Sequence, residues 1–150
     1  MTSAPAGASF SARIHRGTVL RLTLDASTLE DPDIDTRSKY VVVLSALLPD
    51  EQVWFAICTS KEEHFNNHPH LQTEILRWVA GEYAWCRAPV TIVDCSKVYS
   101  IPMEKLERLY LDGRLAFAGG IRPKHLQAID AITKKSRFLS PEDKRWVVPW

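Results

Sequence analysis

The alternation of apolar and polar residues predicts β-strands in the first two-thirds of the chain. Leu20, Leu22 and Leu24 are separated by Arg21 and Thr23, and this period of two is typical of a half-buried strand. Later strands are marked by apolar, β-branched runs. The pattern predicts strands at residues 18–24, 40–48, 53–59, 89–95 and 98–101, with a turn at residues 49–50 between the second and the third.

Helical spacing of apolar residues is found mainly in the last third. Leu126, Ile129 and Ile132 form an apolar stripe behind a proline, a residue that is favoured in the first turn of a helix. The same criteria predict helices at residues 71–80, 102–111 and 123–138 and a short one after Ser140. Residues 25–38, rich in Asp, Ser and Thr, and residues 61–70 are expected to form polar loops.

Strands early and helices late favour the α+β class, with a small, strongly bent antiparallel sheet or barrel and appended helices. The 150 residues, 45% of them hydrophobic, suit one compact domain with its own core. No internal repeat or linker divides the chain. We therefore expect a disordered arm at residues 1–14 and a single domain with a C-terminal helical tail at residues 15–150.

Composition does not favour a membrane-spanning, secreted, disulfide-bonded or zinc-binding protein. No apolar run approaches the roughly 20 residues that a membrane-spanning helix needs, and the N-terminal segment lacks the pattern of a secretory signal. Cys58, Cys86 and Cys95 are odd in number and lack CxxC spacing, which favours neither a disulfide framework nor a zinc site. We expect a cytoplasmic protein with reduced thiols and no cofactor or metal.

The net charge of +1 hides an asymmetry between the two halves of the chain. Residues 1–75 carry six Lys or Arg and ten Asp or Glu, whereas residues 76–150 carry thirteen and eight. A basic second half can meet a polyanion or the acidic half of another chain. It is also compatible with ordinary solvated surface.

The segment from Lys39 to Lys61 carries the most informative chemistry. Two apolar runs are joined by a short polar turn, with Lys39 before the first run and Thr59, Ser60 and Lys61 at the end of the second. Neighbouring antiparallel strands lie about 5 Å apart, so a hairpin brings these ammonium and hydroxyl groups together at one end. The arrangement is suited to holding a phosphate group rigidly.

Five segments together resemble the MazF/PemK family of toxin endoribonucleases, over most of residues 16–136. They are GTVLRL at residues 17–22, VVVLS at 41–45, CTS at 58–60, VYSIP at 98–102 and GRL at 113–115 followed by a helix. The resemblance implies an SH3-like β-barrel with appended C-terminal helices, a homodimer, and a cognate antitoxin protein as partner. It also implies metal-independent cleavage of single-stranded RNA, by attack of a ribose 2′-hydroxyl on the adjacent phosphate.

The same resemblance implies roles for residues of the hairpin. Lys39 stands where the family has Arg, as a source of positive charge and of a proton, and Thr59 is the hydroxyl that orients the phosphate. Arg37 offers a bidentate phosphate contact, and Asp35 a proton acceptor. Because an ammonium is a point charge and a guanidinium a planar fork, Lys39 is a substantive departure from the family. Catalytic roles are thus expected for Lys39, Thr59 and Arg37, and substrate contacts for Asp35, Ser60, Lys61, Trp85 and Arg87.

The tryptophans leave two alternatives open. Trp54 and Trp78 lie in periodic segments and are expected in the core. Trp85 suits either core packing or the stacking of an RNA base. In the tail, Trp146 and Trp150 are expected either to dock on the domain or to form a subunit contact.

Three histidines lie close together at His64, His68 and His70. Their spacing permits a metal site with the neighbouring carboxylates, but Pro69 and the surrounding asparagines favour an irregular surface loop. A further alternative is contact with RNA, through stacking of a histidine or of Phe65 on unpaired bases.

The leading hypothesis is a toxin-like, metal-independent endoribonuclease controlled by an antitoxin. The first alternative is a non-catalytic member of the same fold that binds RNA or protein, which the replacement of the family Arg by Lys39 favours. A third class is a structural protein that binds a partner through the tryptophan-rich tail.

Overall fold

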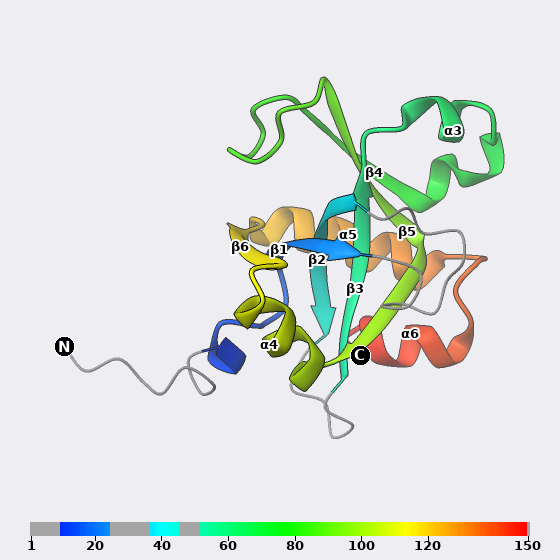
Figure 1. Cartoon of the computed structure of the whole chain (residues 1–150). Coiled ribbons are helices and arrows are strands. Elements are labelled where there is room, and N and C mark those ends of the chain that lie inside the picture. The colour runs from blue at the N-terminus through cyan, green and yellow to red at the C-terminus, as the bar shows by residue number, and fades with distance from the viewer. Residues whose placement is uncertain (1–9, 25–36, 46–51, 150) are drawn as a thin grey trace.

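The computed structural model describes residues 10–24, 37–45 and 52–149. Six strands form one antiparallel sheet in the order β4-β5-β3-β2-β1-β6 (Figure 1). They are β1 (Thr18–Leu24), β2 (Arg37–Ser45), β3 (Gln52–Thr59), β4 (Ile75–Val79), β5 (Val90–Pro102) and β6 (Leu115–Gly120). The predicted α+β class is confirmed. In the described part of the chain β4 and β6 form the edges, so the sheet is open rather than closed into a barrel.

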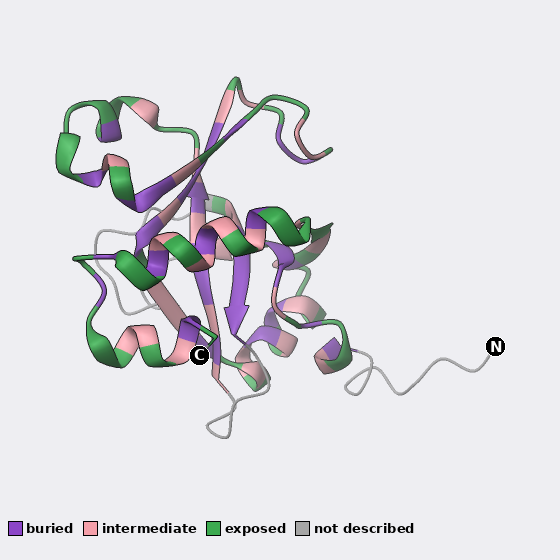
Figure 2. Ribbon diagram, turned by 180° about the vertical axis from the view of Figure 1, so that it is seen from behind, coloured by how far each residue is buried: buried purple, intermediate pink, exposed green. Residues whose placement is uncertain are grey.

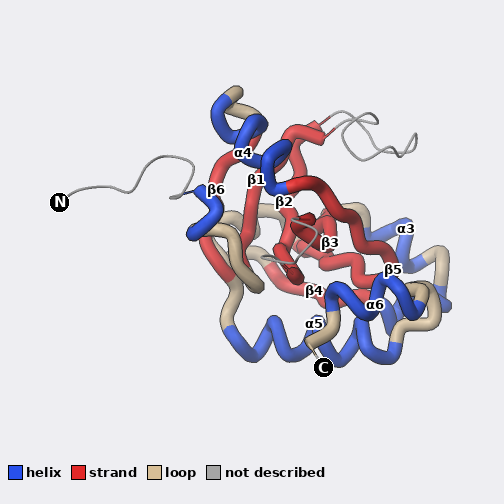
Figure 3. Tube along the Cα trace, turned by 90° about the horizontal axis from the view of Figure 1, so that it is seen from below, coloured by secondary structure: helices blue, strands red, loops and turns tan. Residues whose placement is uncertain are grey.

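Helices cover both faces of this sheet. Figures 2 and 3 show α5 and α6 on one face, and α4 with the helical turn at residues 10–12 on the other. The helices are α3 (Glu62–Asn66), the 3-10 helix η1 (Pro69–Glu74), α4 (Met103–Leu111), α5 (Pro123–Lys135) and α6 (Pro141–Val147). None of these described helices is long and apolar enough to cross a membrane.

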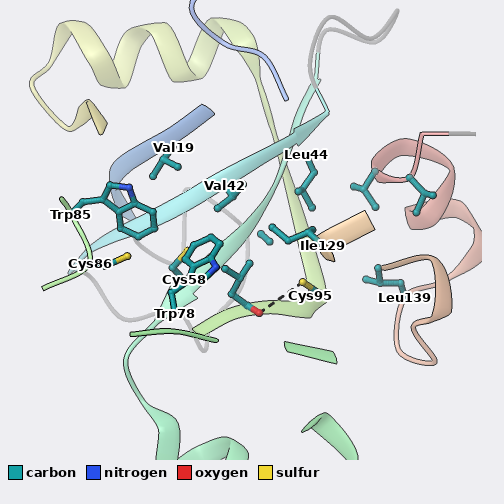
Figure 4. Close-up of a cluster of buried hydrophobic side chains, with 14 residues drawn as sticks. Val19, Val42, Leu44, Cys58, Trp78, Trp85, Cys86, Cys95, Ile129 and Leu139 are labelled. Carbon is teal, nitrogen blue, oxygen red and sulfur yellow. Dashed lines mark hydrogen bonds between the residues drawn. The ribbon is translucent and has the colours of Figure 1, made fainter. Parts of the chain in front are cut away.

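The burial of β2 on both of its faces explains why the central apolar run of the sequence is continuous. Val42 and Leu44 belong to a core under α5 and α6 (Figure 4), whereas Val41 and Val43 belong to a second core under α4. All four are completely buried. Side chains alternate between the faces of a strand, so a strand covered on both sides needs apolar residues at every position.

The C-terminal helices confirm much of the predicted pattern. Helix α5 contributes the fully buried Ile129 to the first core but ends at Lys135, earlier than predicted. Helix α6 begins at a capped Ser140, whose hydroxyl accepts a hydrogen bond from the Asp143 N–H at 3.0 Å. The indole of Trp146 stacks on Trp54 with ring centroids 6.3 Å apart, so the tail docks on the domain at this residue.

Arg16, in the turn before β1, ties distant parts of the chain together. Its guanidinium donates to both carboxylate oxygens of Asp130 on α5, at 2.7 and 2.6 Å. It also donates to the carbonyl oxygens of Leu44 and Val147, at 2.6 and 3.3 Å. This group, which we call the Arg16 clasp, joins the start of β1, β2, α5 and the end of α6.

The predicted helix at residues 71–80 is wrong. The segment forms the last part of η1 followed by strand β4, which pairs antiparallel with β5. Ile75 and Trp78 are buried three positions apart, a spacing that also suits one turn of a helix. Pairing with β5 makes the segment a strand rather than a helix. Gly81, at φ +86°, lies in the turn that follows.

The two short strands predicted at residues 89–95 and 98–101 are one strand, β5. Its pairing with β3 shifts between Phe55, which faces Tyr99, and Ile57, which faces Asp94. Residues 95–98 therefore lie opposite Ala56 alone, and such a bulge bends a strand without ending it. This bend lets the first half of β5 pair with β3 and β4 together.

Other predicted boundaries also change. Phe10 and Ile14 are buried in the core under α4, so the disordered arm predicted for residues 1–14 is wrong from Phe10 onward. Residues 61–70, predicted as a loop, contain α3 and the start of η1, and strand β6 was not predicted. The loop predicted at residues 25–38 lies outside the described residues except for Arg37 and Ser38, which belong to β2 and not to a loop. The turn predicted at residues 49–50 also lies outside the described residues.

Candidate functional site

A pocket of about 320 Å³ lies where β2 begins and β3 ends. Its volume is at the low end of the range for small-molecule sites. Strand ends, the segment after β3, the β4–β5 loop and the start of β5 form its walls. The described lining residues are Ser38, Lys39, Tyr40, Cys58, Thr59, Ser60, Lys61, Trp85, Arg87, Ala88 and Thr91.

The hairpin register brings Lys39 and Thr59 together. Val41 on β2 faces Ile57 on β3 in the last pair at this end of the hairpin, and Lys39 and Thr59 each lie two residues beyond that pair. Both side chains are half-buried, and both line the pocket. The Thr59 hydroxyl accepts a hydrogen bond from the Lys61 N–H at 3.2 Å, which fixes the chain as it leaves β3.

The pocket has the charge of an anion site. Lys39, Lys61 and Arg87 contribute three cations, and none of the described lining residues is acidic. Hydroxyl groups of Ser38, Thr59, Ser60 and Thr91 add neutral donors to the same walls. Cations and hydroxyls around one small hollow favour the binding of a phosphate or carboxylate group.

Aromatic rings form one wall of the pocket. The rings of Tyr40 and Trp85 lie 4.9 Å apart, and Trp85 stacks on Tyr83 at 5.7 Å with nearly parallel planes. Trp85 is 9% exposed, so it packs in the core and borders the pocket at the same time. Core packing of Trp85 and Trp78 is confirmed, and stacking of an RNA base on Trp85 stays a prediction.

The β4–β5 loop that carries Trp85 and Arg87 is fastened to the start of α5. The Tyr83 hydroxyl accepts from the Arg122 N–H at 2.8 Å and donates to Nδ1 of His125 at 2.6 Å. Nε2 of His125 lies 3.5 Å from the Glu82 carboxylate, which also pairs with the Arg122 guanidinium. This network positions a wall of the pocket, although its residues do not line it.

Burial, with the positive charges of Arg122 and Lys124 adding to it, lowers the pKa of His125 below its ordinary value of 6.5. The folded protein therefore holds His125 neutral at pH 7, as an acceptor for the Tyr83 hydroxyl. Unfolded chains bind this proton more readily, so the contribution to stability is complete above about pH 6.5 and is lost as the pH falls through the folded-state pKa.

Replacing His125 by Asn should flatten this pH dependence. The amide oxygen of Asn can take the place of Nδ1 as acceptor for Tyr83, but it does not titrate. We expect the free energy of unfolding of the parent to fall more steeply between pH 7.5 and 5 than that of His125→Asn. Urea unfolding at each pH measures this difference, and parallel curves for the two proteins would contradict it.

Cys58 also lines the pocket, but its thiol is unsuited to nucleophilic chemistry. Burial, with the nearby Cys86 adding to it, raises the pKa of Cys58 well above its ordinary value. Because the thiolate is the reactive form, the protonated Cys58 is inert at neutral pH. Cys58, Cys86 and Cys95 are all buried and free (Figure 4).

The three histidines do not line this pocket; His64 lies on α3, His70 on η1 and His68 directly before η1. His64 and His68 have ring centroids 4.6 Å apart, and His68 and His70 are 5.7 Å apart. In the described part of the chain, no three His, Cys, Asp or Glu side chains are arranged to hold a metal ion. Phe65 is buried at 2% exposure, so the suggestion that it stacks on bases is wrong.

Most of the predicted site residues meet in one place. Arg37 is the first residue of β2, and Asp35 lies outside the described residues. Neither Tyr83 nor His125 was predicted, because nothing in the sequence signals their contact. The predicted site residues that line the pocket are Lys39, Thr59, Ser60, Lys61, Trp85 and Arg87.

Comparison of the chain with protein-family models, with curated proteins and with solved structures found no match. The resemblance to the MazF/PemK family accordingly stays a hypothesis that rests on the residues themselves.

Proposed function

We propose that the pocket binds a phosphate of single-stranded RNA and that the protein is a metal-independent endoribonuclease of the MazF/PemK type. The observation that supports this function best is the meeting of three cations with the Thr59 and Ser60 hydroxyls beside an aromatic wall. Cations match the phosphate, hydroxyls orient it, and aromatic rings match the flat face of a base.

In the proposed reaction the ribose 2′-oxygen attacks the adjacent phosphorus while the bond to the 5′-oxygen of the next nucleotide breaks. Lys39 stabilises the charge on the phosphorane and supplies a proton to the leaving 5′-oxygen. Thr59 orients the phosphate, and Arg87 adds positive charge from the opposite wall. Asp35, four residues before Lys39, is the proposed acceptor of the 2′ proton, and Arg37 the proposed second phosphate contact.

Cleavage of a long mixed-sequence RNA should persist in EDTA. The products should carry a 2′,3′-cyclic phosphate and a 5′-hydroxyl, because the nucleophile belongs to the RNA itself. Mapping of the cleaved ends, with and without end-group phosphatase and kinase treatment, measures this. A strict requirement for added divalent metal would overturn the mechanism.

A second candidate is an RNA- or protein-binding module without catalysis. It is favoured by the absence of any carboxylate or imidazole among the described lining residues, since the reaction needs an acceptor for the 2′ proton. The two candidates differ in a bacterial host. A nuclease should arrest growth when it is expressed, whereas a binding module should accumulate to high yield with normal growth.

Further expectations of the resemblance are part of the proposal. They are a relationship of this open sheet to the SH3-like barrel fold, a homodimer, a cytoplasmic location and a cognate antitoxin. An acidic antitoxin segment would complement the cations of the pocket. A partner-binding role for the tail is not proposed, because Trp146 stacks on Trp54 of the same chain.

A further inference from the structure

A second hollow of about 550 Å³ adjoins the pocket on the α3 side. Its described lining residues are Ser60, Lys61, Glu62, Glu63, His64 and Asn67. Ser60 and Lys61 line both hollows, so the two lie on either side of this dipeptide. In Figure 1, α3 and the β4–β5 loop project from the same end of the molecule.

A row of exposed rings leads away from this second hollow. It begins at His64 in the hollow wall and continues through His68 and His70 to Phe138, with successive centroids 4.6, 5.7 and 5.7 Å apart. All three histidines are exposed, and Phe138 is 48% exposed. We call these four residues the ring row.

Buried anchors hold the histidine half of the ring row. Phe65 packs with Leu71, Ile75 and Ile92 in a small core of its own, directly beneath the exposed side of α3. The Gln72 side chain donates to the Phe65 carbonyl oxygen at 2.6 Å, which links η1 to α3. The segment is thus a fixed platform rather than a loose loop.

A buried carboxylate holds the Phe138 end. Glu74, 3% exposed at the end of η1, accepts hydrogen bonds from the Ser136 hydroxyl and, at 3.3 Å, from the Arg137 N–H. The Ser136 hydroxyl in turn accepts from the Phe138 N–H at 3.1 Å. These bonds fix the segment after α5 against η1 and place Phe138 beside His70.

We propose that the ring row is a stacking surface for the bases of single-stranded RNA next to the phosphate held in the pocket. This inference rests on the proposed phosphate binding, because Ser60 and Lys61 connect the two hollows. Exposed rings stack on any base, so the surface extends the binding site without fixing its sequence.

Charge around the ring row suits a polyanion. Lys61 lies at its beginning and Arg137 directly before Phe138. Of the two carboxylates in the hollow wall, Glu62 pairs with Arg77 at 3.4 Å, which offsets its charge, whereas Glu63 is exposed to solvent. A strand of RNA entering the pocket therefore finds rings for its bases and a cation near each end of the row.

Binding of two fluorescent ten-nucleotide strands tests the inference. Both carry 2′-O-methyl groups, which block cleavage; one is oligoadenylate, and the other has the same backbone without bases. Phe138→Ala and His70→Ala should each weaken binding of oligoadenylate about 5- to 100-fold and leave binding of the abasic strand unchanged. Two independent variants guard against a local loss of structure in either one.

Matched controls are available elsewhere on the surface. Leu111→Ala removes an apolar side chain that is even more exposed than Phe138, and His15→Ala removes an exposed histidine; neither should change the affinity. Lys39→Ala should weaken binding of both strands, because it acts on the phosphate. Unchanged oligoadenylate binding by the row variants, equal losses for the two strands, or a parent protein that binds neither strand would each overturn the inference. Cleavage in EDTA is judged separately, since these strands are not cleaved.

Discussion

Replacing Lys39 by Ala should slow RNA cleavage about 10²- to 10³-fold, as does the loss of one charge-stabilising donor in other enzymes. Lys39 and Thr59 lie at neighbouring ends of β2 and β3, and both line the pocket. Its ammonium is therefore placed to stabilise charge that develops on the phosphate. Single-turnover cleavage of a short RNA at saturating protein measures the effect on the chemical step.

Two further substitutions sharpen this test. Lys39→Arg should retain or raise activity, because guanidinium restores a bidentate phosphate contact. Thr59→Val keeps the shape of the strand while it removes the hydroxyl, so activity should fall with little change in thermal stability. If Lys39→Ala cleaves RNA as fast as the parent, the assignment is wrong, and Arg37 and Arg87 become the next residues to replace.

Replacing Ile129 by Ala should lower the free energy of unfolding by about 2–5 kcal/mol. Ile129 is completely buried between α5 and the sheet, in the core that also contains Leu139 and Val147 (Figure 4). Its removal leaves a cavity that three elements border, so local collapse cannot fill the space easily. Urea unfolding at pH 7.5 measures the change.

Leu111→Ala is the matched control for this stability prediction. Leu111 also lies in a helix, but it is 69% exposed, so its removal should change the free energy of unfolding by less than about 0.5 kcal/mol. Similar losses for the two variants would mean that α5 does not cover the sheet as described.

Sequence periodicity predicted a strand correctly where the spacing of apolar residues fits only a strand. It failed where the same spacing also fits a helix. Strands β1, β2 and β3 were predicted because alternation or a continuous apolar run has one interpretation. In β4, buried residues three apart fit a helix as well as a strand, and only the pairing with β5 distinguishes them. Strand β6, ending in Gly119-Gly120, lacks the β-branched residues that mark a strand.

The part of the candidate site that comes from a single hairpin could be predicted from the sequence. The two apolar runs predict a hairpin, and a hairpin returns the end of β3, with Thr59, towards the start of β2, with Lys39. Arg87 and Trp85 reach the same pocket from a loop whose position depends on Tyr83 and His125, 42 residues apart. No local pattern encodes such a contact, because it arises only when α5 packs on the sheet.

The Arg16 clasp has a consequence for how the chain is completed during synthesis. The partners of Arg16, which are Leu44, Asp130 and Val147, lie 28, 114 and 131 residues further along the chain. Arg16 thus cannot make all of these contacts until Val147 has been translated. Contacts of such long range slow folding, so the nascent chain should reach its native state late, after Val147 has been added.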